Sequence, residues 1–171
     1  MGDLESSRDP VLSAPTPITE GHVTAGFASG NSTLDDWLGQ KAWKSEGQTA
    51  RTYVVCHGNR VVGYYGIAMG AVQRNLSPGK VRRNAPDPIP VAVLARLAVD
   101  ATYQGQGIGA GMLKDACKRI LMAAEIIGVR AILVHAIDEP ARAFYARYGF
   151  AAYPDGTLTM FLPLETIVDA L

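Results

Sequence analysis

The chain has 171 residues, of which 48% are hydrophobic and 19% charged, and its formal net charge is zero. This composition supports one domain with an apolar core, excludes bulk disorder, and includes no apolar run of the roughly 20 residues that a membrane helix needs. The N-terminus lacks the basic-then-apolar pattern of a secretory signal, and two cysteines, Cys56 and Cys117, are too few for a disulfide framework, so we expect a soluble cytoplasmic protein with two buried free thiols.

The predicted elements follow a polar N-terminal stretch. Residues 1–14 are expected to be a loose segment, and residues 15–171 are expected to form a single domain. Two prolines within residues 14–19 are compatible with an edge strand. Apolar residues at helical spacing predict a helix that is capped by Ser32 and ends at Gly47.

The middle of the chain is rich in β-forming residues. Runs over 51–56 and 61–69 flank a short Gly/Asn turn and predict an antiparallel hairpin. Residues 75–90 hold four of the ten prolines and are expected to be a loop. The nearly continuous apolar run over 91–99 is typical of a strand at the centre of a sheet.

The last third of the chain alternates between helical and strand patterns. We expect a helix over 108–127, a strand over 130–136, a helix that begins at the cap Asp138 and ends at Gly149, and a closing strand over 158–162. Together with the antiparallel hairpin, this order predicts an α/β fold in which helices flank one mixed central sheet.

The most informative stretch is a glycine-rich turn between the apolar strand and the long helix. Its sequence is Gln104-Gly105-Gln106-Gly107-Ile108-Gly109-Ala110. Glycines let the backbone approach a ligand closely, and the start of a helix offers unpaired N–H groups and the positive end of the helix dipole. The turn is therefore expected to bind a phosphate or diphosphate group, and a strand-to-helix turn without a ligand is the structural alternative.

Two widespread nucleotide-binding patterns fit this turn poorly. Gly105, Gly107 and Ala110 match a loose dinucleotide fingerprint, but antiparallel strands precede the turn, whereas that fingerprint follows the first strand of a parallel unit. The Walker pattern fails because no Gly-Lys-Ser/Thr follows. Neither nucleotide-binding fold is therefore expected.

The turn and the strand before it resemble a known family. Gln104-x-x-Gly107-x-Gly109 after Leu97-Ala98-Val99-Asp100 is similar to the acetyl-CoA diphosphate loop of the Gcn5-related N-acetyltransferases (GNAT), and the resemblance covers residues 15–163. Within that superfamily the chain resembles the toxins of type II toxin–antitoxin pairs, which acetylate the amino acid on charged tRNA. The segments that carry this closer resemblance are Leu34-Asp35-Asp36-Trp37-Leu38, Ala50-Arg51-Thr52-Tyr53-Val54-Val55, Val62-Gly63-Tyr64-Tyr65, Arg96-Leu97-Ala98-Val99-Asp100 and Phe144-Tyr145-x-x-Tyr148-Gly149-Phe150. Tyr148 departs from the family, which usually has phenylalanine there.

The resemblance implies a GNAT fold and a way of binding acetyl-CoA as co-substrate. The strand that ends at Val99 would splay from the strand near His135, and the backbone of Leu97 and Val99 would bind the amides of the pantetheine arm. The backbone N–H groups that would hold the diphosphate are those of Gln104, Gly105, Gly107, Ile108, Gly109 and Ala110. No metal site is expected.

Acetyl transfer requires a neutral amine and a proton donor to the departing thiolate. An α-amine, with a pKa of about 7.7–8.0, is partly neutral at physiological pH, so an enzyme that acts on an aminoacyl ester needs no strong base. Tyr145 matches the family's general acid. His135 is more typical of a satisfied core histidine than of a base, and Glu139 of a carboxylate that stabilises a helix N-terminus. The aromatic residues expected in the core are Phe144, Tyr148 and Phe150.

Charge is concentrated although the chain is neutral overall. Seven basic residues and one acidic residue, Asp87, lie between positions 47 and 99. Such a region suits a polyanion such as tRNA, because contacts between cationic side chains and phosphates dominate its binding. A solvated surface with salt bridges is the plainer alternative. The candidate tRNA-binding residues are Lys80, Arg82 and Arg83 in the proline-rich loop, and Arg51 and Arg96 nearer the cleft.

The leading hypothesis is an acetyl-CoA:aminoacyl-tRNA N-acetyltransferase that blocks translation. One alternative is acetylation of a small amine or a protein N-terminus. Another is a non-enzymatic module that senses acetyl-CoA or acts only as a corepressor with its antitoxin. The resemblance also implies a ribbon–helix–helix antitoxin, DNA contact only through the antitoxin complex, and a homodimer, and no membrane association is expected.

Overall fold

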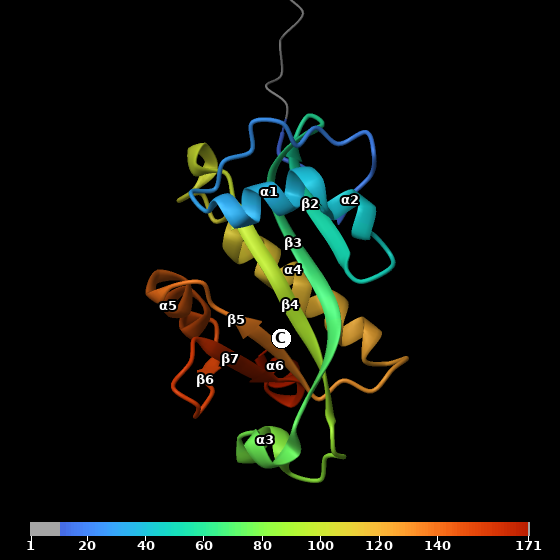
Figure 1. Ribbon diagram of the computed structural model, residues 1–171, viewed down its shortest axis with the longest axis vertical. Helices are drawn as coiled ribbons and strands as arrows, with labels where there is room; N and C mark the ends of the chain where they lie inside the picture. The colour runs from blue at the N-terminus through green and yellow to red at the C-terminus, as the bar shows by residue number, and fades with distance from the viewer. Residues whose placement is uncertain (1–10, 171) are drawn as a thin grey trace, which may run out of the picture.

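One seven-stranded sheet forms the centre of the structure. The computed structural model describes residues 11–170, and its strands are ordered β1-β2-β3-β4-β5-β7-β6 (Figure 1). β4 and β5 run parallel, and the other neighbouring strands are antiparallel. The strands are β1 (Thr16–Pro17), β2 (Arg51–His57), β3 (Arg60–Val72), β4 (Ile89–Val99), β5 (Ala131–His135), β6 (Ala151–Ala152) and β7 (Thr159–Pro163). This mixed sheet confirms the predicted fold class.

Helices cover both faces of the sheet. In Figure 1, α1 crosses in front of β3 and β4, while α4 lies behind them. The helices are α1 (Ser32–Gln40), α2 (Ala42–Ser45), α3 (Gly79–Arg82), α4 (Ile108–Ala123), α5 (Glu139–Arg147) and α6 (Leu164–Ala170), with two 3-10 turns, η1 (Arg74–Leu76) and η2 (Ala101–Tyr103). None of these described helices has the length and apolar character that a bilayer span requires.

Alternation along the strands divides the core between the two faces. Tyr65 of β3 packs in the cluster that contains Met112 of α4, whereas its neighbour Tyr64 packs in the cluster that contains Trp37 of α1. A Cβ atom at Gly63 would lie 3.2 Å from the Met112 side chain, so this glycine lets α4 pack directly on β3. That contact fixes where α4 begins relative to the end of β4.

The helix predicted from Ser32 to Gly47 differs in two respects. It is two helices, α1 and α2, with the break at Lys41. Its cap is Asn31 instead of Ser32, because the extended backbone of Asn31 lets its side chain accept a hydrogen bond from the Leu34 N–H at 3.1 Å.

The pairing of the N-terminal segment with the sheet begins earlier than predicted. Within the segment expected to be loose, residues 1–14, Leu12 forms an antiparallel bridge with His57. The Ser13 N–H donates to the Cys56 carbonyl at 2.8 Å. Residues 1–10 of that segment lie outside the described part of the chain. The backbone is therefore tied to β2 before residue 15.

Later boundaries also shift. The loop expected over 75–90 contains α3, and β4 begins at Ile89 within it. α4 ends at Ala123, four residues before the predicted end, and β6 and α6 are not predicted from the sequence.

The hairpin of β2 and β3 is confirmed, as is the cap Asp138, which accepts a hydrogen bond from the Ala141 N–H at 2.8 Å. Both cysteines are free, but Cys117 is only half-buried.

Candidate active site

β4 separates from β5 part-way along its length. The parallel pairing of the two strands ends at Leu94 and Val134, and one extra residue, Ala95, makes a bulge where β4 pairs with β3. From Arg96 to Val99, β4 is paired with β3 and, among the described strands, not with β5. This divergence is the splay that the family resemblance implies.

The separation leaves backbone groups of β4 without a strand partner. The Asp100 N–H donates to the Val62 carbonyl at 2.8 Å, which is a hydrogen-bonded pair of the antiparallel ladder. Because bonded and non-bonded pairs alternate, the N–H and C=O groups of Val99 and Leu97 point away from β3 and into the gap. The Val99 carbonyl is partly used, since the Gln104 side-chain amide donates to it at 2.9 Å.

A glycine turn leads from β4 into α4. Gly105 and Gly107 have φ angles of +81° and +82°, in the left-handed region that favours glycine. Gly107 is the N-cap of α4, and in the described structure no side chain caps this end of the helix. The first N–H groups of α4 are therefore available to an anionic ligand.

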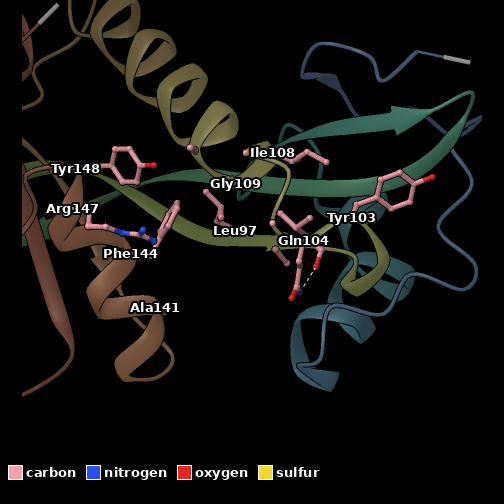
Figure 2. A pocket seen from close by; sticks show the side chains of 14 residues that line it. Leu97, Tyr103, Gln104, Ile108, Gly109, Ala141, Phe144, Arg147 and Tyr148 are labelled. Atoms are coloured by element: carbon pink, nitrogen blue, oxygen red, sulfur yellow. Dashed lines mark hydrogen bonds between the residues drawn. The ribbon is translucent and has the colours of Figure 1, made fainter.

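A cleft of about 570 Å³ opens beside this turn, between the end of β4, the start of α4 and the helix α5 (Figure 2). Figure 2 shows the Phe144 ring extending from α5 toward Leu97 and Gly109, with Arg147 and Tyr148 beside it. The structure brings together all eight residues predicted to bind the cofactor, and each lines the cleft: Leu97, Val99, Gln104, Gly105, Gly107, Ile108, Gly109 and Ala110.

The aromatic residues of α5 and the turn after it are divided between core and cleft. Phe150 is buried in the core, as predicted. Tyr148 is 46% exposed and lines the cleft, so the expectation that it belongs to the core is wrong. Phe144 packs against the core and lines the cleft at the same time. Sequence spacing identifies residues on one face of a helix, but it does not indicate whether another element covers that face.

Tyr145 lies in a second, smaller space. It is 8% exposed and lines a cavity of about 50 Å³ together with Leu34, Arg96 and His135. This small cavity shares Leu97 with the cleft, so the two spaces adjoin along the free edge of β4. Burial raises the pKa of Tyr145 to about 12, which keeps its hydroxyl protonated at neutral pH.

The two other titratable candidates have local partners. His135 is exposed, with its Nδ1 atom 3.0 Å from the Thr159 hydroxyl, so it is not the core histidine expected from the sequence. Glu139 lies in the first turn of α5 and forms an ion pair with Arg142 at 3.7 Å. Its place agrees with a helix-stabilising role. Among residues 11–170, no group of three His, Cys, Asp or Glu side chains is arranged to hold a metal ion.

Two of the predicted tRNA-binding residues lie on strands of the sheet, Arg51 at the start of β2 and Arg96 near the end of β4. The Arg96 guanidinium stacks over the Trp37 ring at 4.0 Å from its centroid and borders the small cavity. Desolvation by burial lowers the pKa of Arg96 from its ordinary value. Arg51 is exposed and forms an ion pair with Glu46 at 3.5 Å. Arg96 is therefore the one of the two that reaches the candidate site.

The other three predicted tRNA-binding residues lie far from the candidate site. Lys80 and Arg82 belong to α3 and Arg83 follows it, at the opposite end of β4 from the glycine turn (Figure 1). All three are exposed, and within the described part of the chain no carboxylate lies within ion-pair distance of them. The Arg130 guanidinium donates to the carbonyls of Val81 and Arg83, at 3.2 and 2.5 Å, and so holds this basic end in place.

This architecture agrees with a family model. Residues 48–152 match the model described as an acetyltransferase (GNAT) domain. The chain belongs to the GNAT acetyltransferase family. The family-level fold and the acetyltransferase class predicted from the sequence are thereby confirmed.

Individual GNAT relatives match nearly the whole chain. A tRNA-acetylating toxin of Mycobacterium tuberculosis (strain ATCC 25618 / H37Rv) is 46% identical over 154 residues, which cover 90% of this chain and 93% of the relative. The structure of AtaT complexed with acetyl-methionyl-tRNAfMet is 25% identical with a TM-score of 0.86 and covers 94% of this chain and 99% of that one. An AtaT mutant toxin bound to the C-terminus of the antitoxin AtaR and acetyl-CoA is 25% identical with a TM-score of 0.78, with coverage of 93% and 97%.

Asp100 is a residue of this GNAT site that sequence reasoning did not single out for a role. It is 2% exposed and accepts hydrogen bonds from the Ala28 N–H at 3.1 Å and from the N–H and hydroxyl of Thr102 at 3.0 and 2.7 Å. Burial by itself would raise the pKa of Asp100, but these hydrogen bonds and the nearby Arg60 outweigh it and hold the pKa below its usual range. As a carboxylate, Asp100 thus anchors the segment that leads from β4 into the glycine turn.

We expect Asp100→Ala to lower the free energy of unfolding by about 3 kcal/mol at pH 7, because three donors lose their acceptor. The folded pKa is lower than the unfolded one, so the stabilisation is present above the unfolded pKa and is lost as pH falls through the folded pKa. The difference in the free energy of unfolding between Asp100→Ala and the unmodified protein should therefore become smaller in acid. Urea unfolding at several pH values measures it, and Asp36→Ala, an exposed carboxylate on α1, is the control. A constant difference at all pH values would contradict this role.

Proposed function

We propose that this chain is the toxin of a type II toxin–antitoxin pair and that it transfers the acetyl group of acetyl-CoA to the α-amine of aminoacyl-tRNA. The observation that carries the proposal is its similarity to the tRNA-acetylating toxin of M. tuberculosis, which extends along most of both chains. The AtaT complex with acetyl-methionyl-tRNAfMet supports the same class of substrate. Acetylation blocks the amine that peptide transfer requires, so the product cannot support translation.

The cleft fits acetyl-CoA by its chemistry. Free N–H groups at the start of α4 suit the diphosphate, and the free edge of β4 at Leu97 and Val99 offers hydrogen-bonding groups to the amides of the pantetheine arm. The thioester then lies in the small cavity beside Tyr145. The AtaT structure with bound acetyl-CoA supports this assignment. Fixing the thioester in an attack geometry contributes several kcal/mol to the rate.

Tyr145 is the general acid of the proposed reaction. The neutral α-amine attacks the thioester carbonyl carbon, a C–N bond forms, the C–S bond breaks, and the Tyr145 hydroxyl donates its proton to the departing sulfur. A phenol with a raised pKa is a weak acid, so this transfer is coupled to loss of the proton from the attacking amine, which restores the hydroxyl. Arg96 lies at the same cavity and is suited to the nearby tRNA backbone.

The distance between the basic residues at α3 and the small cavity favours a large substrate. The strand from Ile89 to Arg96 covers about 23 Å at ~3.3 Å per residue, so the basic end at α3 is far from the small cavity. A small amine at the cavity cannot reach that end, whereas an RNA whose 3′ end lies at the mouth of the cavity extends well beyond it. Lys80, Arg82 and Arg83 are therefore assigned to phosphates of the acceptor arm.

Replacing Lys80, Arg82 and Arg83 together with alanine is expected to raise the KM for charged tRNA about tenfold in low salt, with kcat nearly unchanged. Up to three phosphate contacts would be lost, so the slope of log affinity against log salt concentration should become shallower by as much as ~2.7. Transfer assays over a range of salt concentrations measure both effects. Lys118→Ala, an exposed lysine on α4, is the control. An unaltered salt slope would remove these residues from the RNA interface.

The decisive test incubates the pure protein with charged tRNA and labelled acetyl-CoA. Label on the aminoacyl group is the expected result, and its absence would refute the proposed function. The same assay with a free small amine or an N-terminal peptide tests the alternative substrates. If these were acetylated faster than charged tRNA at equal concentration, the protein would be a GNAT enzyme of another substrate class.

The proposed function includes a partner. An antitoxin is expected to mask the toxin, as the complex of AtaT with the C-terminus of AtaR suggests, and DNA would be contacted only through the antitoxin complex. We also propose that the antitoxin is of the ribbon–helix–helix type and that the toxin is a cytoplasmic homodimer. Light scattering of the purified chain measures its oligomeric state.

A further inference from the structure

Residues 28–31, here called the α1 strap, lie against the segment that leads from β4 into the glycine turn. The Ala28 N–H donates to the buried carboxylate of Asp100 at 3.1 Å, and the Ala28 carbonyl accepts from the Ala101 N–H at 2.8 Å. These two bonds join segments that are more than 70 residues apart in the sequence.

The Gln104 side chain adds a third link. Its amide nitrogen donates to the Ser29 carbonyl at 3.0 Å and to the Val99 carbonyl at 2.9 Å, and Figure 2 shows this side chain extending from the turn toward the α1 region. Its two hydrogens are thus directed at protein carbonyls, and the ligand is left to the backbone of the turn. The bonds are exposed to solvent, so water competes with them in the free protein.

The α1 strap continues directly into α1. The N–H and the hydroxyl of Ser29 donate to Asp35 Oδ1 at 3.0 and 2.6 Å. Asn31 caps the helix through the Leu34 N–H. The strap and the first turn of α1 therefore move together.

α1 forms one wall of the small cavity. Leu34 lines this cavity, and its carbonyl accepts a hydrogen bond from the Tyr64 hydroxyl at 2.7 Å. Trp37, one turn further along, stacks on Tyr64, and the Arg96 guanidinium lies over the Trp37 ring. A displacement of the α1 strap would therefore alter the wall that faces the attacking amine.

We propose that Gln104 is a positioning residue that couples the glycine turn to α1. Acetyl-CoA bound at the turn then orders the acceptor wall, which is the wall of the small cavity that Leu34 and Arg96 form and that faces the attacking amine. This inference rests on the proposed function, because it takes acetyl-CoA as the ligand. A diphosphate held by the turn favours the turn conformation in which Gln104 reaches Ser29, and the link then favours one position of α1. By linkage, the ordered wall also strengthens binding of the second substrate.

Hydrogen exchange at saturating acetyl-CoA tests the coupling. In the unmodified protein, acetyl-CoA should slow exchange in residues 100–111 and also in residues 28–38. In Gln104→Ala, slowing in 100–111 should persist, while slowing in 28–38 should fall by at least half. Gln106→Ala removes an exposed glutamine side chain from the same turn and should behave like the unmodified protein. Gln104→Met, which keeps the length of the side chain without a charge and cannot donate, should match Gln104→Ala.

Kinetics give a second readout. At saturating acetyl-CoA, Gln104→Ala should raise the KM for charged tRNA about fivefold and leave kcat within about twofold, the lower end of typical coupling between sites. Unchanged exchange in 28–38 on acetyl-CoA binding to the unmodified protein, or full retention of that effect in Gln104→Ala, would overturn the coupling and leave the proposed function intact. No slowing in 100–111 would instead remove acetyl-CoA from the turn, and both proposals with it.

Discussion

Replacing Tyr145 with phenylalanine is expected to lower kcat for acetyl transfer by at least about 100-fold and to change the acetyl-CoA dissociation constant by less than about twofold. The substitution removes the hydroxyl that donates a proton to the departing sulfur, and it leaves the glycine turn and the free edge of β4 as they are. Transfer to charged tRNA measures the first effect, and calorimetric titration with acetyl-CoA measures the second.

The effect is expected to be independent of pH over a wide range. Burial raises the pKa of Tyr145 to about 12, so the hydroxyl of the unmodified protein keeps its proton from about pH 6 to about pH 10. The ratio of the two kcat values should therefore stay constant in that interval. A ratio that collapsed between pH 8 and 10 would indicate a tyrosine in a much less buried state.

Tyr153→Phe is a matched control for this substitution. Tyr153 has the same 8% exposure as Tyr145, and its hydroxyl pairs with Ser77 Oγ at 3.1 Å, away from the cleft. Loss of this bond should lower stability by about 1 kcal/mol without changing kcat. A growth assay of cells that express each variant gives a further readout. If Tyr145→Phe kept full activity and still arrested the growth of these cells, Tyr145 would be a core residue only. Arrest without turnover would favour the non-enzymatic, acetyl-CoA-sensing function.

Features that depend on local sequence could be predicted. The Asp138 cap, the hairpin turn and the glycine-rich turn between β4 and α4 each follow from neighbouring residues, and all lie where the sequence places them. The order of these elements was sufficient to predict a mixed sheet, and the glycine-rich turn indicated the start of α4 as a candidate ligand site. The choice between Ser32 and Asn31 as the cap of α1 was not predictable, because adjacent residues of similar capping ability compete.

Features that depend on distant contacts could not be predicted. Gln104 and Ser29 are 75 residues apart, so nothing near Gln104 indicates that its side chain binds the α1 strap. Tyr148 has the spacing of a core residue, but its exposure depends on how far the start of α4 stands from α5. The same basic region of the sequence contains Arg96 and the three residues Lys80, Arg82 and Arg83, yet most of the length of β4 separates Arg96 from the other three. Three-dimensional placement was needed in each case.

The glycine turn itself is tested by Gly107→Val, which is expected to weaken acetyl-CoA binding by at least about 100-fold. A left-handed conformation costs a residue with a side chain about 1–2 kcal/mol, and a β-branched residue more, so the turn should adopt another conformation. Its N–H groups would then leave the diphosphate, and each lost bond to a charged group removes about 1.5–3 kcal/mol. Two such losses exceed the 2.7 kcal/mol that a 100-fold change requires, at about 1.36 kcal/mol per factor of ten.

Gly111→Ala separates this effect from a general change in α4. Gly111 lies one turn further along the helix, has no positive φ, and has nothing within 4 Å of the position its Cβ would take. Alanine there should raise helix stability by up to about 1 kcal/mol and leave acetyl-CoA affinity unchanged. Calorimetry and thermal unfolding of both variants give affinity and foldedness side by side. A folded Gly107→Val that binds acetyl-CoA normally would mean that the N–H groups at the start of α4 do not hold the diphosphate, and the thioester would then have no reason to lie beside Tyr145.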